Sequence, residues 1–142
     1  MPINFYFEQK VTLKNRKQLK LFIASVFKGE GKALSSLNYI FCNDEALLKI
    51  NKQYLGHDYY TDIISFDLSE TKADPTIGEI YISVDRVKEN AKDLSVPLSQ
   101  ELHRVIFHGA LHLCGDKDKT AKQQKLMRTK EGLYLTKYGL LP

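Results

Sequence analysis

The chain has 142 residues, of which 43% are hydrophobic and 27% charged, a balance typical of one globular domain with one core. No apolar stretch is long enough to span a bilayer, and the start, MPINFYFEQK, lacks the regions of a signal peptide. We therefore expect a single cytoplasmic domain over residues 1–142. Two cysteines, Cys42 and Cys114, are too few for a disulfide framework and fit a reducing compartment.

The net charge of +4 is concentrated near the C-terminus. Residues 116–142 hold seven Lys or Arg and three Asp or Glu, whereas the other 115 residues hold 14 of each. Such a segment favours a polyanionic partner, because phosphates attract it and counterions are released on binding. A solvated helix face is the more ordinary explanation of a charge run, and only its place beside the motif described below favours function.

Hydrophobic periodicity and turn residues divide the chain into strands and helices. In chain order we expect a strand at 3–8, a helix at 15–27, a strand at 34–42, a helix at 43–54, strands at 61–69 and 77–84, and helices at 85–94, 97–114 and about 120–138. Asn43 or Asp44 is expected to cap the second helix, and Asp85 the third. The order predicts an α+β fold with a small mixed four-stranded sheet covered by about five helices.

The stretch HGALHLCGDKD, residues 108–118, carries the chemistry. His108 and His112 are four apart on a predicted helix, so both imidazoles project from one face. Gly115 ends that helix and turns the chain back, which brings Asp118 within reach of the same ion. Two packed histidines without metal are the simpler alternative, but the longer pattern is more constrained.

Two histidines and one carboxylate leave a coordination position open for water, the arrangement of catalytic zinc. We therefore predict one Zn²⁺ bound by His108, His112 and Asp118, although nickel, iron or manganese also suits these ligands. Such an ion supplies a hydroxide nucleophile near neutral pH. His103 lies on another side of the helix, and Cys114 also points elsewhere, so neither is expected to be a ligand.

The spacing also matches the zinc-protease pattern H-E-x-x-H-x-x-G-x-x-H, in which the glutamate is the general base. Gly109 occupies that position here, so the motif has no group to take the proton from water. Phosphodiester cleavage depends at least as much on stabilising charge at the phosphate. The basic flank fits that chemistry better, with candidate RNA contacts at Lys117, Lys119, Lys122, Lys125 and Arg104.

Several linked motifs resemble the YbeY family of bacterial endoribonucleases, or rRNA maturation factors. HGALHLCGDKD is similar to the family's H-G-x-L-H-L-x-G-Y-D-H, and residues 61–67, TDIISFD, are similar to T-D-V-L-S-F-P. GEIYIS at 78–83 and NKQYLGHDYYTD at 51–62 resemble G-D-I-x-I-S and N-x-x-Y-R-x-x-D-x-x-T-D. The similarity runs from about residue 38 to 126, with the motifs in the family's order.

The resemblance implies a metal-dependent, single-strand-selective endoribonuclease acting in rRNA maturation and ribosome quality control. It also implies the small ribosomal subunit and ribosome-assembly factors as partners. Two positions depart from the family. Its third metal histidine falls on Asp118, whose charge makes the metal a weaker Lewis acid, and its arginine after the tyrosine falls on Leu55, which cannot bind phosphate.

Three functions are therefore weighed: the endoribonuclease, a metalloprotease-like hydrolase, and a ribosome-associated binding protein with a structural metal and weak nuclease activity. Leu55 motivates the third. Thr61, Asp62 and Ser65 either orient a metal ligand or close a turn. Glu79 is a carboxylate either on the rim of the site or on an exposed strand face.

Overall fold

The computed structural model describes residues 2–142, which form one sheet and five helices. The elements, in chain order, are β1 (Ile3–Phe7), α1 (Arg16–Gly29), β2 (Leu34–Cys42), α2 (Asp44–Leu55), β3 (Ile63–Asp67), β4 (Thr76–Ser83), α3 (Val84–Leu94), α4 (Leu98–Leu113) and α5 (Ala121–Tyr138). This order confirms the α+β architecture expected from the periodicity. No helix within these residues is both long and apolar enough to cross a membrane.

The four strands lie in the order β1-β2-β4-β3. β1, β2 and β4 are parallel neighbours, and β3 runs antiparallel to β4, so the sheet is mixed as predicted. Parallel neighbours need a crossover, and α1 supplies the one between β1 and β2. β3 therefore forms a sheet edge, and the site described below lies beside it.

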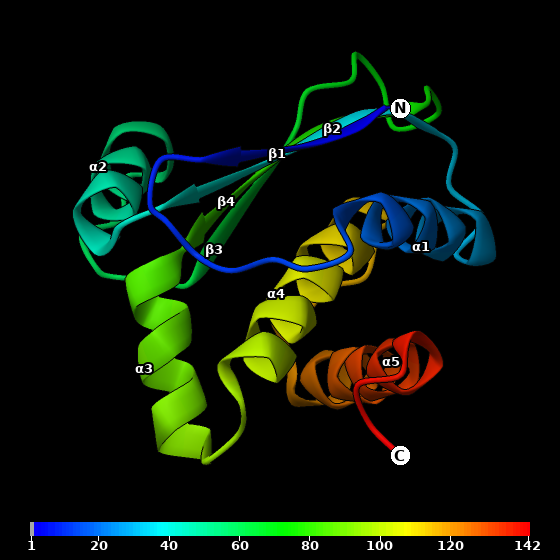
Figure 1. Cartoon of the computed structure of the whole chain (residues 1–142). Helices are drawn as coiled ribbons and strands as arrows, with labels where there is room; N and C mark the ends of the chain where they lie inside the picture. The colour runs from blue at the N-terminus through cyan, green and yellow to red at the C-terminus, as the bar shows by residue number, and fades with distance from the viewer. Residues whose placement is uncertain (1) are drawn as a thin grey trace.

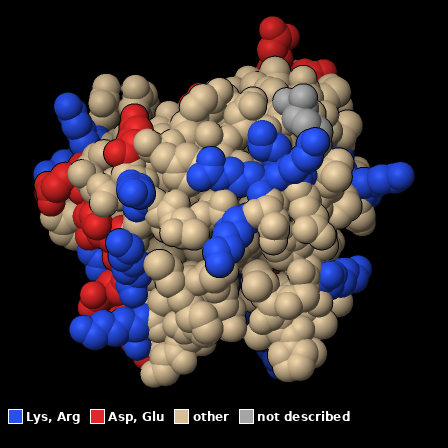
Figure 2. All heavy atoms as spheres, in the orientation of Figure 1, with Lys and Arg blue, Asp and Glu red and all other residues tan. Residues whose placement is uncertain are grey.

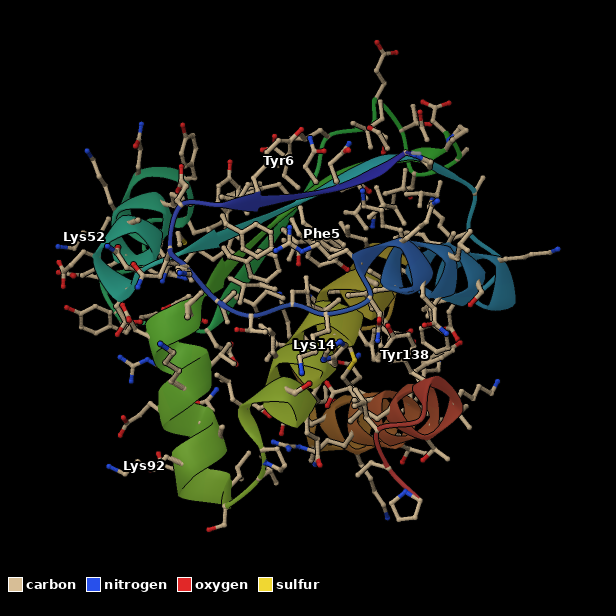
Figure 3. The ribbon with its side chains drawn as sticks, in the orientation of Figure 1. Phe5, Tyr6, Lys14, Lys52, Lys92 and Tyr138 are labelled. Atoms are coloured by element: carbon tan, nitrogen blue, oxygen red, sulfur yellow. The ribbon has the colours of Figure 1, made fainter. Side chains whose placement is uncertain are left out.

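The two faces of the sheet are covered unequally. Side chains alternate along a strand, and Figure 3 shows Phe5 and Tyr6 pointing to opposite sides of β1. On the Phe5 side, α1 and α4 cover the sheet and α5 lies beyond α4 (Figure 1). On the Tyr6 side, α2 covers a small cluster of Cys42, Leu47 and Ile64, while Tyr6 itself is 52% exposed.

Helix α4 packs closely against β3 and β4 because glycines lie at the contact on both sides. Gly109 of α4 faces the strands, and Gly78 of β4 faces α4. A Cβ on Gly109 would lie 2.8 Å from Ile63 Cδ1 and 2.9 Å from Ile80 Cδ1. A Cβ on Gly78 of β4 would lie 2.6 Å from Leu113 Cδ1. With Gly109 against the sheet, α4 presents His108 and His112 to the space beside β3.

Helix α5 packs on the far side of α4 through apolar and aromatic contacts. Met127, Tyr134 and Leu135 join the main core. Tyr138 lies between α1 and α5 (Figure 3), with its ring centroid 4.8 Å from that of Phe22. α5 is thereby fixed against the helix that carries the histidines.

Two sequence expectations at element ends need correction. The N-cap of α3 is Ser83, whose side chain accepts from the backbone N–H of Arg86 at 3.2 Å, and not Asp85. β4 runs directly into α3, so its last residue takes the capping position, and Asp85 instead accepts from the backbone N–H of Asp44 at 2.9 Å. The third strand is also shorter than predicted, since only Ile63–Asp67 pairs with β4. Asn43 does cap α2, as expected.

A second group of basic residues lies on a surface away from the C-terminal segment, and the sum of charges over residues 1–115 does not reveal it. Residues 9–29 contain six Lys or Arg and no Asp or Glu, and Figure 2 shows Lys and Arg grouped over β1 and α1. Over α2 and α3 the two signs are mixed in the same view. The charges of residues 1–115 therefore sum to zero although the basic and acidic side chains are unevenly distributed over the surface.

The close contact at Gly109 predicts that Gly109→Ala lowers the free energy of unfolding by about 1–3 kcal/mol, because the added methyl overpacks Ile63 and Ile80. Urea denaturation followed by circular dichroism measures this change. Gly132→Ala in α5 is the matched control, because a Cβ there meets nothing within 4 Å. That control should raise stability by about 0.5–1 kcal/mol. Equal stabilities of the two variants would contradict the proposed contact.

Candidate active site

A hollow of about 590 Å³ lies where β3, α4, the chain after α2 and the chain before α5 meet. His108, His112 and Asp118 all line it, as do Leu55 and Arg104. The fold thus brings the three predicted metal ligands to one hollow. His108 Nε2 lies 3.4 Å from Asp118 Oδ2, and the centroids of the two imidazole rings are 6.0 Å apart.

The hydrogen-bond partner of His108 determines which of its ring nitrogens carries the hydrogen. His108 Nδ1 lies 2.6 Å from Glu131 Oε2. Burial raises the pKa of Glu131, but the hydrogen bond from His108 and the charge of Arg104 outweigh burial and hold that pKa below its usual value. An ionised carboxylate only accepts hydrogen bonds, so Nδ1 carries the hydrogen. In neutral His108 the lone pair is then on Nε2, facing Asp118.

The same argument places the hydrogen of neutral His112 on Nδ1. Its Nδ1 lies 2.8 Å from the backbone carbonyl oxygen of Asp116, which also only accepts. The Asp116 side chain is held in turn by Lys130, whose Nζ donates to Asp116 Oδ1 at 2.8 Å and to Glu30 Oε1 at 2.5 Å. Tyr134 Oη donates to Glu30 Oε2 at 2.7 Å. Lys130 and Glu131, adjacent on α5, therefore support the two histidines, Lys130 indirectly and Glu131 directly.

Arg104 is surrounded by carboxylates. Its Nη1 donates to Glu131 Oε1 at 3.0 Å, and its Nε donates to Glu101 Oε1 at 2.8 Å. Asp62 Oδ2 lies 3.8 Å from Nη2. Burial raises the pKa of Asp62 more than the charge of Arg104 lowers it. Arg104 lines the hollow as the sequence suggested, but an RNA phosphate would have to compete with these carboxylates for its guanidinium.

The predicted lysines are divided among different places. Lys119 lines the hollow beside Asp118, whereas Lys117 lines a second, neighbouring hollow. Lys122 and Lys125 are exposed on the first turns of α5 and line neither of these two hollows. The sequence did not single out Arg128, which reaches the first hollow from α5.

The donors fit a divalent transition ion in type and protonation, since two imidazole lone pairs and one carboxylate share the hollow. The acceptors on both Nδ1 atoms are the partners that metal-binding histidines generally have. The donors do not form a closed cage. Within residues 2–142, no three His, Cys, Asp or Glu side chains are gathered closely enough to hold an ion.

Other residues considered from the sequence lie away from the ligands. His103 is buried, its Nδ1 is 2.6 Å from the carbonyl oxygen of Ser99, and its ring stacks on Tyr138. Burial raises the pKa of the Cys114 thiol to about 12, which disfavours a thiolate ligand. Glu79 accepts from Tyr81 Oη at 3.1 Å on the α2 side of the sheet.

The remaining polar candidates belong to β3 and the turn before it. Thr61 Oγ1 donates to the carbonyl oxygen of Ile63 at 3.4 Å, and Asp62 Oδ2 accepts from Asn90 Nδ2 at 3.1 Å. Ser65 lines both hollows. Thr61 and Asp62 also line the first hollow, but within the described chain none of the three forms a hydrogen bond with the imidazole of His108 or His112.

Sequence reasoning missed Glu131, although a signal for it was present. It is the only acidic residue in α5, which carries five Lys or Arg. It also falls on the helix side formed by Met127, Tyr134 and Leu135, at spacings of three and four residues, where an apolar residue is expected. A lone carboxylate on a buried helix face needs a polar partner, and His108 and Arg104 are those partners.

The comparisons with known proteins agree with one another. The family model described as Endoribonuclease YbeY matches residues 4–139. A protein of that name from Cytophaga hutchinsonii is 46% identical over 134 residues, covering 93% of each chain. Another from Porphyromonas gingivalis is 48% identical over 130 residues, covering 91% of this chain and 85% of that one. The solution structure of TM1509 from Thermotoga maritima is 26% identical, with a TM-score of 0.64, and covers 96% of this chain and 91% of its own.

The buried contacts of Glu131 predict that Glu131→Ala lowers the free energy of unfolding by about 3 kcal/mol, because Arg104 and His108 lose a partner that is 4% exposed. Glu89→Ala is the matched control in the exposed middle of α3 and should change stability by no more than about 0.5 kcal/mol. Chemical denaturation of both variants measures the difference. A loss for Glu131→Ala no larger than that for Glu89→Ala would show that these contacts contribute little.

Proposed function

This chain belongs to the endoribonuclease YbeY family, and on that premise we propose that it is a zinc-dependent endoribonuclease that cleaves single-stranded RNA. The site would be the hollow that His108, His112 and Asp118 line. The observation that carries the proposal is the state of the two imidazoles. Each has an acceptor on Nδ1, which leaves Nε2 of the neutral ring free to bind a metal.

When bound, a divalent ion polarises a phosphoryl oxygen and lowers the pKa of a water molecule in its coordination sphere. The chain itself supplies positive charge and orientation around it. Lys119 and Arg128 line the hollow and can stabilise negative charge that develops on a phosphate. Glu131 holds the His108 ring through the 2.6 Å contact at Nδ1, so the ring keeps one orientation as substrate enters.

Two aromatic rings that line the hollow support the proposed selectivity for unpaired RNA. His57 and Tyr59 line it, and their rings stack with centroids 5.1 Å apart and an interplanar angle of 19°. Tyr59 is 56% exposed. An exposed aromatic surface can stack on a base that is free of a partner, whereas a base inside a duplex is already stacked.

The protease alternative is disfavoured by the position of Gly109. Glycine has no carboxylate, and a Cβ at this position would already lie 2.8 Å from Ile63 Cδ1 and 2.9 Å from Ile80 Cδ1. The close packing leaves no space for a glutamate side chain, so this position supplies no general base.

We also propose rRNA as the substrate and the small ribosomal subunit, with its assembly factors, as the partner in the cytoplasm. The support is the family relationship together with the net charge of +4, which favours binding to a polyanion. A binding protein with a structural metal and weak nuclease activity is the second candidate. Leu55 favours it, because this apolar side chain lines the hollow where a cation could otherwise contact phosphate.

The metal proposal predicts that the double variant His108→Ala, His112→Ala loses bound zinc and cleavage of unstructured RNA together. His103→Gln is the control, since this histidine is on the same helix but buried against Tyr138. It should keep about one ion per chain. Elemental analysis of the purified proteins, paired with a cleavage assay with and without chelator, gives both readouts. Full cleavage by the double variant in chelator would refute the metal mechanism.

The position of Leu55 predicts that Leu55→Arg increases the rate of RNA cleavage, by about tenfold if one added phosphate contact stabilises the transition state by about 1.4 kcal/mol. Leu94→Arg adds the same charge at an exposed leucine on α3 and should leave the rate unchanged. Single-turnover cleavage of an unstructured oligoribonucleotide measures both. A parallel increase in both variants would assign the gain to net charge instead of position 55.

A further inference from the structure

A second hollow of about 630 Å³ adjoins the first. Both are lined by Ser65, His112 and Lys119, so they meet at one of the candidate metal ligands. An RNA strand that leaves the first hollow beside His112 would enter the second. An RNA strand that occupies both would therefore pass beside His112.

Four lysines from three separate segments surround this second hollow. Lys32 follows α1, Lys72 lies between β3 and β4, and Lys117 and Lys119 lie between α4 and α5. We call these four residues and the space between them the lysine hollow. Gathering ammonium groups from distant parts of the chain costs electrostatic energy unless anions screen them.

The two acids in the lysine hollow are already engaged within the protein. Asp116 Oδ1 accepts from Lys130 at 2.8 Å, and Asp67 Oδ1 accepts from the backbone N–H of Ser69 at 3.0 Å. Neither forms a salt bridge with any of the four lysines within residues 2–142. Four lysines against two acids, of which Asp116 is paired with Lys130 outside the hollow, leave the lysine hollow with a positive charge.

Lys32 has a structural task that the other lysines lack. Its Nζ donates to the carbonyl oxygens of Lys72 and Asp74, and so ties the chain after α1 to the β3–β4 connection. This contact fixes the wall that carries Lys72. Lys72 and Lys117 are exposed, and neither ammonium has a salt-bridge partner in the part of the chain that the structure describes.

We propose that the lysine hollow binds the phosphate backbone of the RNA strand on one side of the cleavage point. The strand then passes His112, with its bases against His57 and Tyr59 in the first hollow and its phosphates against lysines in the second. The chemistry of the linings supports this division, because His112 is the only aromatic ring among the described residues of the lysine hollow. This inference rests on the proposed function and names the path of its substrate.

The test compares Lys72→Gln, Lys117→Gln with a control double variant, Lys88→Gln, Lys92→Gln, which removes two exposed lysines from α3. Binding of an unstructured 12-nucleotide RNA is followed by fluorescence anisotropy in chelator, at several salt concentrations, so no cleavage is needed. Loss of two phosphate contacts to single-stranded RNA lowers the magnitude of the salt slope by about 1.4 and weakens binding about tenfold near 0.15 M salt. The control should retain the slope and affinity of the unchanged protein.

Equal losses in the two double variants, or no loss in either, would overturn the lysine hollow as a backbone site. A 12-residue polyglutamate that binds as tightly as the RNA, with the same loss in Lys72→Gln, Lys117→Gln, would overturn it in favour of an acidic protein segment. The proposed function is judged separately by chelator-sensitive cleavage. If Lys72→Gln, Lys117→Gln specifically loses RNA binding but the unchanged protein never cleaves RNA, the lysine hollow is supported and the nuclease function is contradicted. If the unchanged protein cleaves RNA and the double variant keeps the same binding and KM, the nuclease function is supported and the lysine hollow is contradicted.

Discussion

The contact between the backbone of α4 and strands β3 and β4 determines where every other part of the site lies. Gly109 and Gly78 permit it, because a side chain at either position would meet Ile63 or Leu113 at less than 3 Å. A helix seated this closely has little freedom to rotate about its axis. The stripe next to Gly109 on the helix surface then faces α5 and the hollow, and it consists of Glu101, Arg104, His108 and His112, at spacings of three and four residues.

Helix α5 supplies the side chains that hold the polar residues of α4 in place. Lys130 and Glu131 are neighbours in sequence, but their side chains serve different turns of α4. Glu131 reaches His108 and Arg104, and Lys130 reaches Asp116, whose carbonyl oxygen accepts from His112. Both imidazoles are thereby held through Nδ1. The buried carboxylate and guanidinium satisfy each other, which offsets the cost of removing them from water.

Local patterns in the sequence were sufficient for the elements and for the histidine pair. Apolar periodicity placed four strands and five helices in the observed order, and the spacing of His108 and His112 required that they share a helix face. Contacts between distant residues were not visible in the same way. Nothing in residues 108–118 indicates that Glu131, 23 residues after His108, is the acceptor.

The capping of α3 and the distribution of charge show the same limit. Asp85 is a good capping residue by type, yet Ser83 caps α3 because β4 leads into the helix without a loop. Likewise, charge summed along residues 1–115 is zero, although residues 9–29 hold six basic and no acidic side chains and Figure 2 shows Lys and Arg grouped over β1 and α1. Side-chain type and local order predict which groups can interact, whereas topology decides which groups meet.

The placement of Lys130 and Glu131 in α5, which follows the sheet and α4 in the chain, has a consequence for biosynthesis. Chains emerge from the ribosome N-terminus first, and their domains fold in that direction. The sheet and α4 can therefore assemble while both histidines still lack the α5 residues that hold them. The helix that carries the two histidines is made before the α5 residues that hold them, so a chain truncated before α5 would carry the ligands without the groups that order them.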